Sequence, residues 1–138
     1  MDKQTVETYS TNAKRFAHEW RDQPAPTDMY ALLQRYFTPG GTTADIGCGA
    51  GRDVAWLNEH GFPTVGYDAA DGLLAQATAN YPSLVFRRAE LPALDGIAKD
   101  AYDNVLCETV VMHLPADEVT QACARLFDIL SRLRKYRR

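Results

Sequence analysis

Three glycines and an acid alternate with other residues in the stretch Asp45-Ile46-Gly47-Cys48-Gly49-Ala50-Gly51. The pattern predicts a short buried strand over residues 42–46 and a helix over 51–60. Glycine permits positive φ and lets a ligand approach the backbone closely, and the amides at the following helix start point into the same space. This turn is therefore a candidate cofactor-binding loop, and the alternative is a glycine turn without a ligand.

The spacing of the glycines separates two classes of cofactor. A dinucleotide loop needs G-x-G-x-x-G or G-x-G-x-x-A, whose last small residue lets helix and strand pack closely. Counted from Gly47 and Gly49, that position holds Arg52, which is neither small nor apolar. The observed D-x-G-x-G-x-G pattern therefore disfavours an NAD-type oxidoreductase.

An acid, Asp68, follows the strand predicted over residues 63–67. A carboxylate has two acceptor oxygens, so it fits the vicinal diol of a ribose at this place in an α/β fold. The alternative is that Asp68 caps the next helix, but Asp71 is an equally good cap and would free Asp68 for a ligand.

Three residues near the end of the strand predicted over 102–107 could act in catalysis. Cys107 could be a nucleophile, but a buried strand cysteine is the favoured interpretation. Glu108 could be a general base or could hold an ordered water. His113 could deprotonate a substrate near neutral pH or could be an ordinary loop residue near a helix start. His18, His60 and His113 lack metal-ligand spacing, so no metal is expected.

Strands and helices alternate along the chain with short connections. This pattern predicts parallel strands with right-handed crossovers, in a doubly wound, Rossmann-like α/β sheet with N-terminal helices. A ligand is expected beyond the carboxyl ends of the strands. Besides the segments above, we expect one helix over about 3–21, one from Asp68 or Asp71 and a strand over 83–87. Thr27 can cap a further helix with Leu32 and Tyr36 on its inner face. Pro115 opens a last helix whose apolar face includes Cys123 and Leu133.

The glycine loop, Asp68 and the aromatic-Asp-x-Val opening at Tyr102-Asp103-Asn104-Val105 resemble class I methyltransferases over residues of about 5 to 130. The resemblance implies S-adenosylmethionine as cofactor. It implies that Asp45, Gly47 and Gly49 line its methionine end, that Glu90 and Leu91 contact adenine, and that Cys107 and Glu108 lie near the methyl-transfer point. It also implies an N-terminal lid, from which Tyr9 touches the cofactor, whereas simple aromatic packing is the alternative.

The resemblance predicts three segments: a helical lid over residues 1–38, a cofactor-binding core over 39–130 and a basic tail over 131–138. Relatives have seven strands, of which about four are expected here, and the Pro-Gly-Gly turn expected after residue 130 is absent. A truncated or altered chain after residue 130 is the resulting interpretation. The fourth strand would then present an open edge that favours self-association.

Composition narrows the class of partner. The chain has 138 residues and a net charge of −3, but residues 131–138 hold five of its 15 basic residues and no acid. The remaining acidic body disfavours nucleic acid as the main partner. Three cysteines without a CxxC pair, no apolar leader and no long apolar stretch favour a cytoplasmic protein outside the membrane.

The favoured function is methyl transfer from S-adenosylmethionine to an O, N or S atom of a small molecule. Glu108 and His113 are the catalytic candidates. The alternatives are a fragment that binds the cofactor without turnover and an NAD-type oxidoreductase.

Overall fold

The computed structural model describes residues 2–21, 23–108 and 113–131. Its centre is a four-stranded sheet in the order β3-β2-β1-β4, in which every neighbouring pair is parallel. The predicted α/β fold is therefore confirmed. The strands are β1 (Thr43–Ile46), β2 (Thr64–Asp68), β3 (Val85–Arg88) and β4 (Asn104–Cys107).

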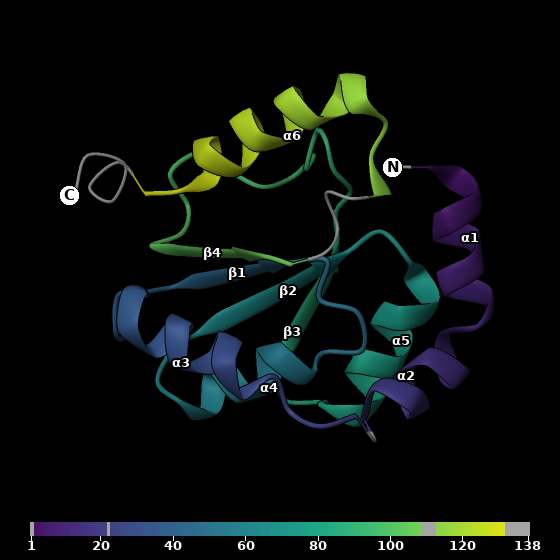
Figure 1. Cartoon of the computed structure of the whole chain (residues 1–138), viewed down its shortest axis with the longest axis horizontal. Coiled ribbons are helices and arrows are strands. Elements are labelled where there is room, and N and C mark those ends of the chain that lie inside the picture. The colour runs from purple at the N-terminus through teal and green to yellow at the C-terminus, as the bar shows by residue number, and fades with distance from the viewer. Residues whose placement is uncertain (1, 22, 109–112, 132–138) are drawn as a thin grey trace.

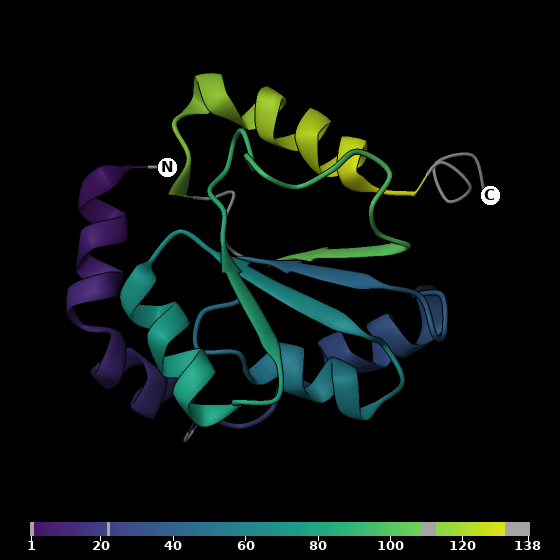
Figure 2. The ribbon, with the colours of Figure 1, turned by 180° about the vertical axis from the view of Figure 1, so that it is seen from behind.

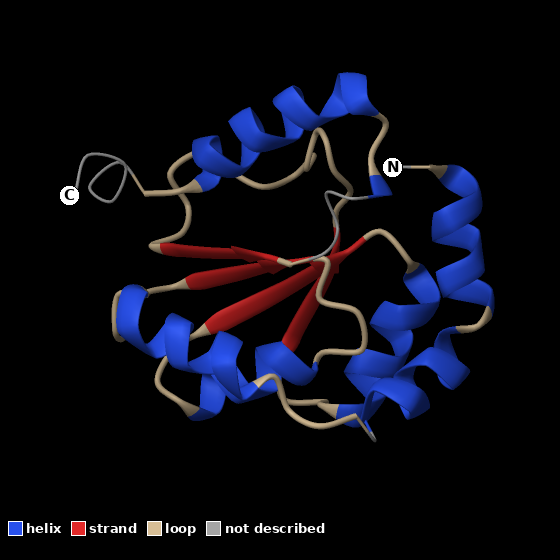
Figure 3. Cartoon of the chain, viewed as in Figure 1, coloured by secondary structure: helices blue, strands red, loops and turns tan. Residues whose placement is uncertain are grey.

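Helices cover both faces of this sheet (Figures 1, 2 and 3). One face is covered by α6, and the other by α3, α4 and α5, while α1 and α2 pack beside α5 near the carboxyl ends of the strands. The helices are α1 (Lys3–Thr11), α2 (Ala13–Arg21), α3 (Thr27–Tyr36), α4 (Arg52–Glu59), α5 (Asp71–Asn80) and α6 (Ala116–Ile129).

A separate apolar cluster forms on each face of the sheet. Beneath α6, Ala44 and Ile46 of β1 pack with Leu91, Leu94 and Ile129. On the opposite face, α3 and α4 meet β4 through a cluster of buried side chains made by Tyr30, Leu33, Leu57, Phe62 and Leu106. Because β1 is buried at every position, its carboxyl end is held rigidly where the glycine loop begins.

The single N-terminal helix predicted over residues 3–21 is wrong, because α1 and α2 are separate helices that meet at Asn12. The Asn12 side-chain amide donates to the Thr8 carbonyl, and the Asn12 backbone N–H bonds to the same carbonyl. An asparagine side chain that bonds to the preceding turn offers the backbone an alternative to continued helix. The break lets α2 turn toward the glycine loop.

Three local expectations about helix caps and faces are also wrong. Thr27 is the first residue of α3, and Pro26 precedes it at the cap position. The side chains of Leu32 and Tyr36, expected on the inner face of α3, are 55% and 70% exposed. Cys123, expected on the inner face of α6, is exposed as well. Amphipathic spacing shows which residues share a helix face. It does not show how much of that face the neighbouring elements bury.

On the side of β4 opposite β1, the only pairing among residues 2–21, 23–108 and 113–131 lies just before the strand. Tyr102 and Leu130 form a parallel bridge. The Tyr102 N–H donates to the Ile129 carbonyl at 3.0 Å, and the Ser131 N–H donates to the Tyr102 carbonyl at 2.6 Å. This bridge precedes the strand for which an open edge is predicted. Leu133, expected to extend the α6 face, lies outside the described residues.

Candidate functional site

A cavity of about 510 Å³ opens at the carboxyl ends of β1, β2 and β4, between the glycine loop and the N-terminal helices. Eight of the ten residues predicted for the site line it, and the other two, Glu90 and Cys107, do not. The eight are Tyr9, Asp45, Gly47, Gly49, Asp68, Leu91, Glu108 and His113.

Glycine is required in the loop after β1 for two distinct reasons. Gly47 and Gly49 have φ of +83° and +56°, in the region that side chains rarely adopt. A Cβ atom on Gly49 would also lie 3.1 Å from the Trp20 ring of α2. The loop therefore allows α2 to close directly onto its backbone.

Asp45 is buried at the end of β1, with 3% of its surface exposed. Its Oδ2 atom accepts no hydrogen bond from the residues that the structure describes, although an unpaired buried polar atom normally costs stability. Burial, together with the nearby carboxylates of Asp53, Asp68 and Glu108, holds the pKa of Asp45 well above its usual range. A buried acceptor without a partner at a cavity wall suits a ligand that brings its own donor, such as an ammonium group.

Asp68 ends β2 and bonds to one backbone amide of the glycine loop and to one just before α5. Its Oδ2 accepts from the Gly49 N–H and its Oδ1 from the Ala70 N–H, both at 2.9 Å. Burial raises its pKa, and these amides oppose the shift. Each carboxylate oxygen has two lone pairs, so Asp68 retains acceptor capacity for a diol while it holds the loop.

The expected alternative cap of α5 is wrong. Asp71 is the first residue of α5, whose cap position is taken by Ala70 without a side-chain bond. The Ala70 N–H is instead bonded by Asp68. Asp68 therefore serves both the turn and the cavity wall, and Asp71 does not release it.

The turn after β3 contributes Ala89 and Leu91 to the cavity wall. The Ala89 N–H donates to the Asp68 carbonyl at 3.2 Å, which ties this turn to the end of β2. The Leu91 side chain is 1% exposed. Glu90 lies between them, partly exposed and outside the lining.

Residues beyond β4 form the opposite part of the lining. Burial and the Asp53 carboxylate raise the pKa of Glu108, and the Arg52 guanidinium opposes this. His113 lies edge-on to Tyr9, with the ring centroids 6.0 Å apart. Cys107 is half-buried, and its pKa rises to about 11 mainly through burial, so its thiol stays protonated at neutral pH.

The N-terminal helices cover the cavity with aromatic rings. Tyr9, Phe16 and Trp20 pack as one cluster, in which the Phe16 and Trp20 rings stack at 5.5 Å. The Ser10 hydroxyl accepts a bond from the Gly72 N–H at 2.8 Å and so fastens α1 to the first turn of α5. A Cβ on Gly72 would lie 2.2 Å from the Ser10 carbonyl oxygen, so this contact requires glycine.

Sequence reasoning missed Trp20, Gln23, Arg52 and Asp53 as lining residues. Arg52 donates to the carbonyls of Trp20 and Gln23 at 3.0 and 3.4 Å, which fastens the end of α2 to the glycine loop. Asp53 accepts a 2.6 Å bond from the Tyr30 hydroxyl. For Arg52 and Asp53, the signal in the sequence was their place directly after the glycine loop, because the first turn of a helix that follows a cofactor loop faces the cofactor site.

The residues that the structure describes contain no group of three His, Cys, Asp or Glu side chains arranged to hold a metal ion. Within the same residues, no helix has the length and apolar character needed to cross a membrane.

A family model described as a methyltransferase domain matches residues 44–132 of the chain, which include all of β1 except Thr43, the other three strands and the whole of α6. The match begins within β1, so the glycine loop, Asp68 and the residues beyond β4 all lie inside it. No curated protein sequence gave a significant match.

Several solved structures share the fold. A TehB-like S-adenosylmethionine-dependent methyltransferase from Corynebacterium glutamicum superposes with a TM-score of 0.75 at 23% identity, over 88% of this chain and 68% of that one. Magnesium protoporphyrin IX methyltransferase from Synechocystis was solved with bound S-adenosylhomocysteine. It superposes with a TM-score of 0.75 at 23% identity, over 94% of this chain and 68% of that one. A Pyrococcus horikoshii protein superposes with a TM-score of 0.69 at 21% identity, over 75% of this chain. The match spans 50% of that protein's length.

Proposed function

Because the chain belongs to the methyltransferase domain family, whose model matches residues 44–132, we propose that it binds S-adenosylmethionine in the 510 Å³ cavity and methylates a small molecule. The acceptor atom in this proposal is O, N or S. The single observation that carries it is the buried, unpartnered Asp45 oxygen, which lies in one cavity with Asp68 and the glycine loop.

The lining residues fit the parts of this cofactor. The unpaired Asp45 carboxylate suits the α-ammonium group, and Asp68 suits the ribose diol. The positive-φ backbone at Gly47 and Gly49 leaves room for the methionine end. Ala89 and Leu91 present an apolar wall to the adenine ring.

The charge of the cavity also agrees with this cofactor. Its lining holds the carboxyl groups of Asp45, Asp53, Asp68 and Glu108, against the single guanidinium of Arg52. S-adenosylmethionine carries a sulfonium and an ammonium against one carboxylate, so it brings a net positive charge into an acidic site. A dinucleotide would instead bring phosphate charges that these acids repel.

When bound, S-adenosylmethionine supplies a methyl group whose carbon an acceptor attacks in line with the bond to the sulfonium sulfur, which leaves as a thioether. The chain's own residues hold the reactants and exclude water, which accounts for most of the catalysis in such a transfer. Tyr9 and Trp20 close the cavity from the N-terminal side. In this proposal, Glu108 and His113, which both line the cavity, take a proton from the acceptor. The raised pKa of Glu108 supports this role, because it makes Glu108 a stronger base than an ordinary glutamate.

Methyl transfer is tested with the whole chain, methyl-labelled S-adenosylmethionine and a panel of hydroxyl, amine and thiol acceptors. We expect labelled product with at least one acceptor class. Glu108→Gln and His113→Gln should lower its rate by about 10²-fold or more, the range for general acid–base catalysis, with little change in S-adenosylhomocysteine affinity. Tight cofactor binding without transfer to any acceptor would contradict catalysis.

A cofactor-binding module without turnover is the second candidate. The labelled-methyl assay separates the two candidates, because both bind the cofactor and only the first consumes it.

Self-association is a further part of the proposal. The strand β4 is paired along β1, and the structure describes a single bridge on its other edge, between Tyr102 and Leu130. Unpaired N–H and C=O groups on such an edge attract another strand. A second copy of the chain is the partner that we propose for this edge.

A further inference from the structure

The connection from β3 to β4, residues 89–103, crosses the sheet face beneath α6 without a helix of its own (Figures 1 and 2). The two preceding crossovers contain α4 and α5, whose backbone groups are bonded within the helix. Backbone carbonyls in a partly buried irregular segment need other partners. In this connection, several of them are bonded by one side chain of α6.

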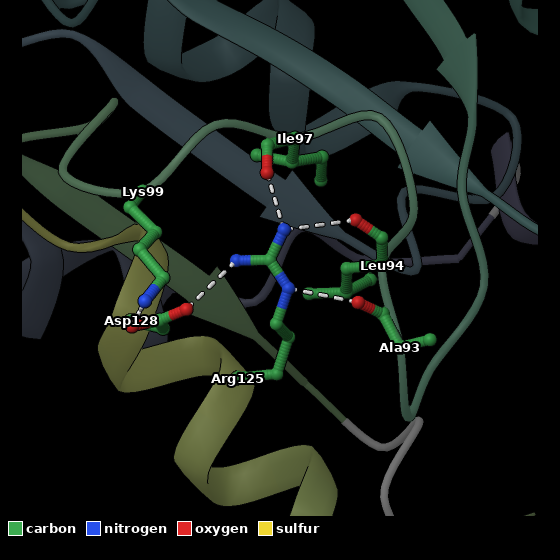
Figure 4. A network of polar contacts seen from close by, with 6 residues as sticks. All are labelled: Ala93, Leu94, Ile97, Lys99, Arg125 and Asp128. Atoms are coloured by element: carbon green, nitrogen blue, oxygen red, sulfur yellow. Dashed lines mark hydrogen bonds and ion pairs between the residues drawn. The ribbon is translucent and has the colours of Figure 1, made fainter.

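That side chain is Arg125 (Figure 4). Its Nε donates to the Ala93 carbonyl at 2.8 Å, and its Nη2 donates to the carbonyls of Leu94, at 3.2 Å, and of Ile97. Its Nη1 bonds to the Asp128 carboxylate at 3.4 Å. The Arg125 side chain is 19% exposed, so these bonds are largely shielded from water.

Asp128, one turn further along α6, extends the brace. Its carboxylate lies 3.8 Å from the Lys99 ammonium, and its backbone carbonyl accepts from the Asp100 N–H at 3.0 Å. Arg125 and Asp128 together therefore hold the connection to α6 from Ala93 to Asp100 (Figure 4).

The braced segment contains a backbone conformation that a leucine rarely adopts. Leu94 has φ of +48° and is fully buried, and its N–H donates to the Glu90 carbonyl at 2.8 Å. Such a conformation persists only where its surroundings fix it. The same connection begins with Ala89 and Leu91, which line the cavity just before the braced turn of residues 93–97.

We propose that Arg125 is a positioning residue for the cofactor, because it holds the 93–97 turn in the shape that keeps Leu91 at the cavity wall. The inference rests on the proposed function for the identity of the ligand at that wall. Arg125 does not line the cavity itself, so it acts through the turn. Lysine cannot replace it, because one ammonium lacks the planar fork that reaches three carbonyls at once.

The test compares R125M and R125K with wild type, and uses R35M as the matched control. Arg35 lies on α3, away from the cavity lining, with its guanidinium over the Tyr36 ring. We expect amide hydrogen exchange at Leu94 and Ile97 to rise selectively in both Arg125 variants. S-adenosylhomocysteine affinity should fall by about tenfold or more at temperatures where each variant is folded, since charge-assisted hydrogen bonds are lost.

A split in kinetics separates positioning from a general loss of stability. The Arg125 variants should raise KM for S-adenosylmethionine more than they lower kcat, whereas R35M should change neither. A folded R125K or R125M chain with wild-type exchange at Leu94 and wild-type affinity overturns this inference alone. A wild-type chain that binds no S-adenosylhomocysteine overturns the proposed function and this inference together, even if the exchange result shows that Arg125 braces the turn.

Discussion

Asp45 and Asp68 end neighbouring strands and line the same cavity, yet their partners differ. Asp68 is already held by two backbone amides, and Asp45 leaves one buried oxygen unpaired. Asp45 therefore depends on a ligand for its missing partner, whereas Asp68 supports the fold and the ligand together.

Replacing Asp68 by alanine should weaken both binding and folding. The loss of a charged acceptor should weaken S-adenosylhomocysteine binding by about 1.5–3 kcal/mol, and the unpaired amides of Gly49 and Ala70 should lower the unfolding free energy by about 1–3 kcal/mol. Calorimetric titration and denaturant melts measure the two effects. Asp71→Ala is the control, because Asp71 is exposed and its ion pair with Arg88 at 3.4 Å contributes little. Unchanged affinity in Asp68→Ala would remove the ribose assignment.

The raised pKa of Asp45 predicts opposite pH trends for folding and binding. Protonated Asp45 stabilises the ligand-free fold below its unfolded pKa of 3.8, and this stabilisation is lost as pH rises through the higher folded pKa. A ligand ammonium binds the ionised form, so S-adenosylhomocysteine affinity should rise over the same interval.

Titrations at a series of pH values check this trend against Asp45→Asn. The variant should bind more weakly and show a smaller rise with pH, to which Asp68 still contributes because its pKa is also raised. Identical pH profiles for wild type and Asp45→Asn would show that Asp45 does not receive the ammonium group.

At the scale of elements, the glycine loop and α2 form one unit. Gly49→Val should abolish S-adenosylhomocysteine binding, because valine resists a φ of +56° and its Cβ would lie 3.1 Å from Trp20. Gly61→Val is the matched control, since Gly61 also has positive φ, at +87°, but nothing lies within 4 Å of its Cβ position. The control should lose stability and keep binding. A folded Gly49→Val chain that still binds would refute the role of the loop.

Sequence periodicity predicted the strands and their parallel orientation, because those features depend on local pattern. The motifs at the strand ends, together with the family resemblance, indicated eight of the residues that line the cavity. Asp45 and Asp68 lie at the carboxyl ends of β1 and β2, and Gly49 lies in the loop after β1. The ends of adjacent parallel strands meet in space. The break at Asn12 was missed because the aromatic residues of α1 and α2 keep helical spacing through it. Helical spacing of apolar residues therefore indicates helix, but it does not show whether one helix runs through the whole segment.

Long-range contacts account for the rest of what the sequence did not predict. The sequence pattern identified Arg52 as a residue too large for a dinucleotide loop. Its bonds to Trp20 and Gln23 instead depend on the end of α2 and the residues after it, which lie 32 and 29 residues earlier in the chain. Arg125 likewise acts on a turn that precedes it by about the same distance. Neither partner is visible in local spacing, because a backbone carbonyl has no sequence signature.

At the scale of the whole molecule, the β4 edge opposite β1, along which the described residues form no ladder, predicts association. Asn104–Cys107 pairs with β1 on one side, and the bridge at Tyr102 covers only the start of the other. We expect the apparent mass to rise with concentration in the micromolar range, with melting midpoints that rise in parallel. Light scattering and denaturant melts at several concentrations measure both. A strictly monomeric, concentration-independent melt would exclude pairing through this edge.

Calorimetric titration of the whole chain with S-adenosylhomocysteine, and separately with NAD, tests the central claim most directly. The acidic cavity, the unpaired Asp45 oxygen and the positive-φ glycine loop predict saturable, one-to-one binding of S-adenosylhomocysteine that Gly49→Val abolishes. They predict no saturable binding of NAD, whose pyrophosphate would face these carboxylates. Tight NAD binding, or no S-adenosylhomocysteine binding by a folded chain, would contradict the proposed cofactor.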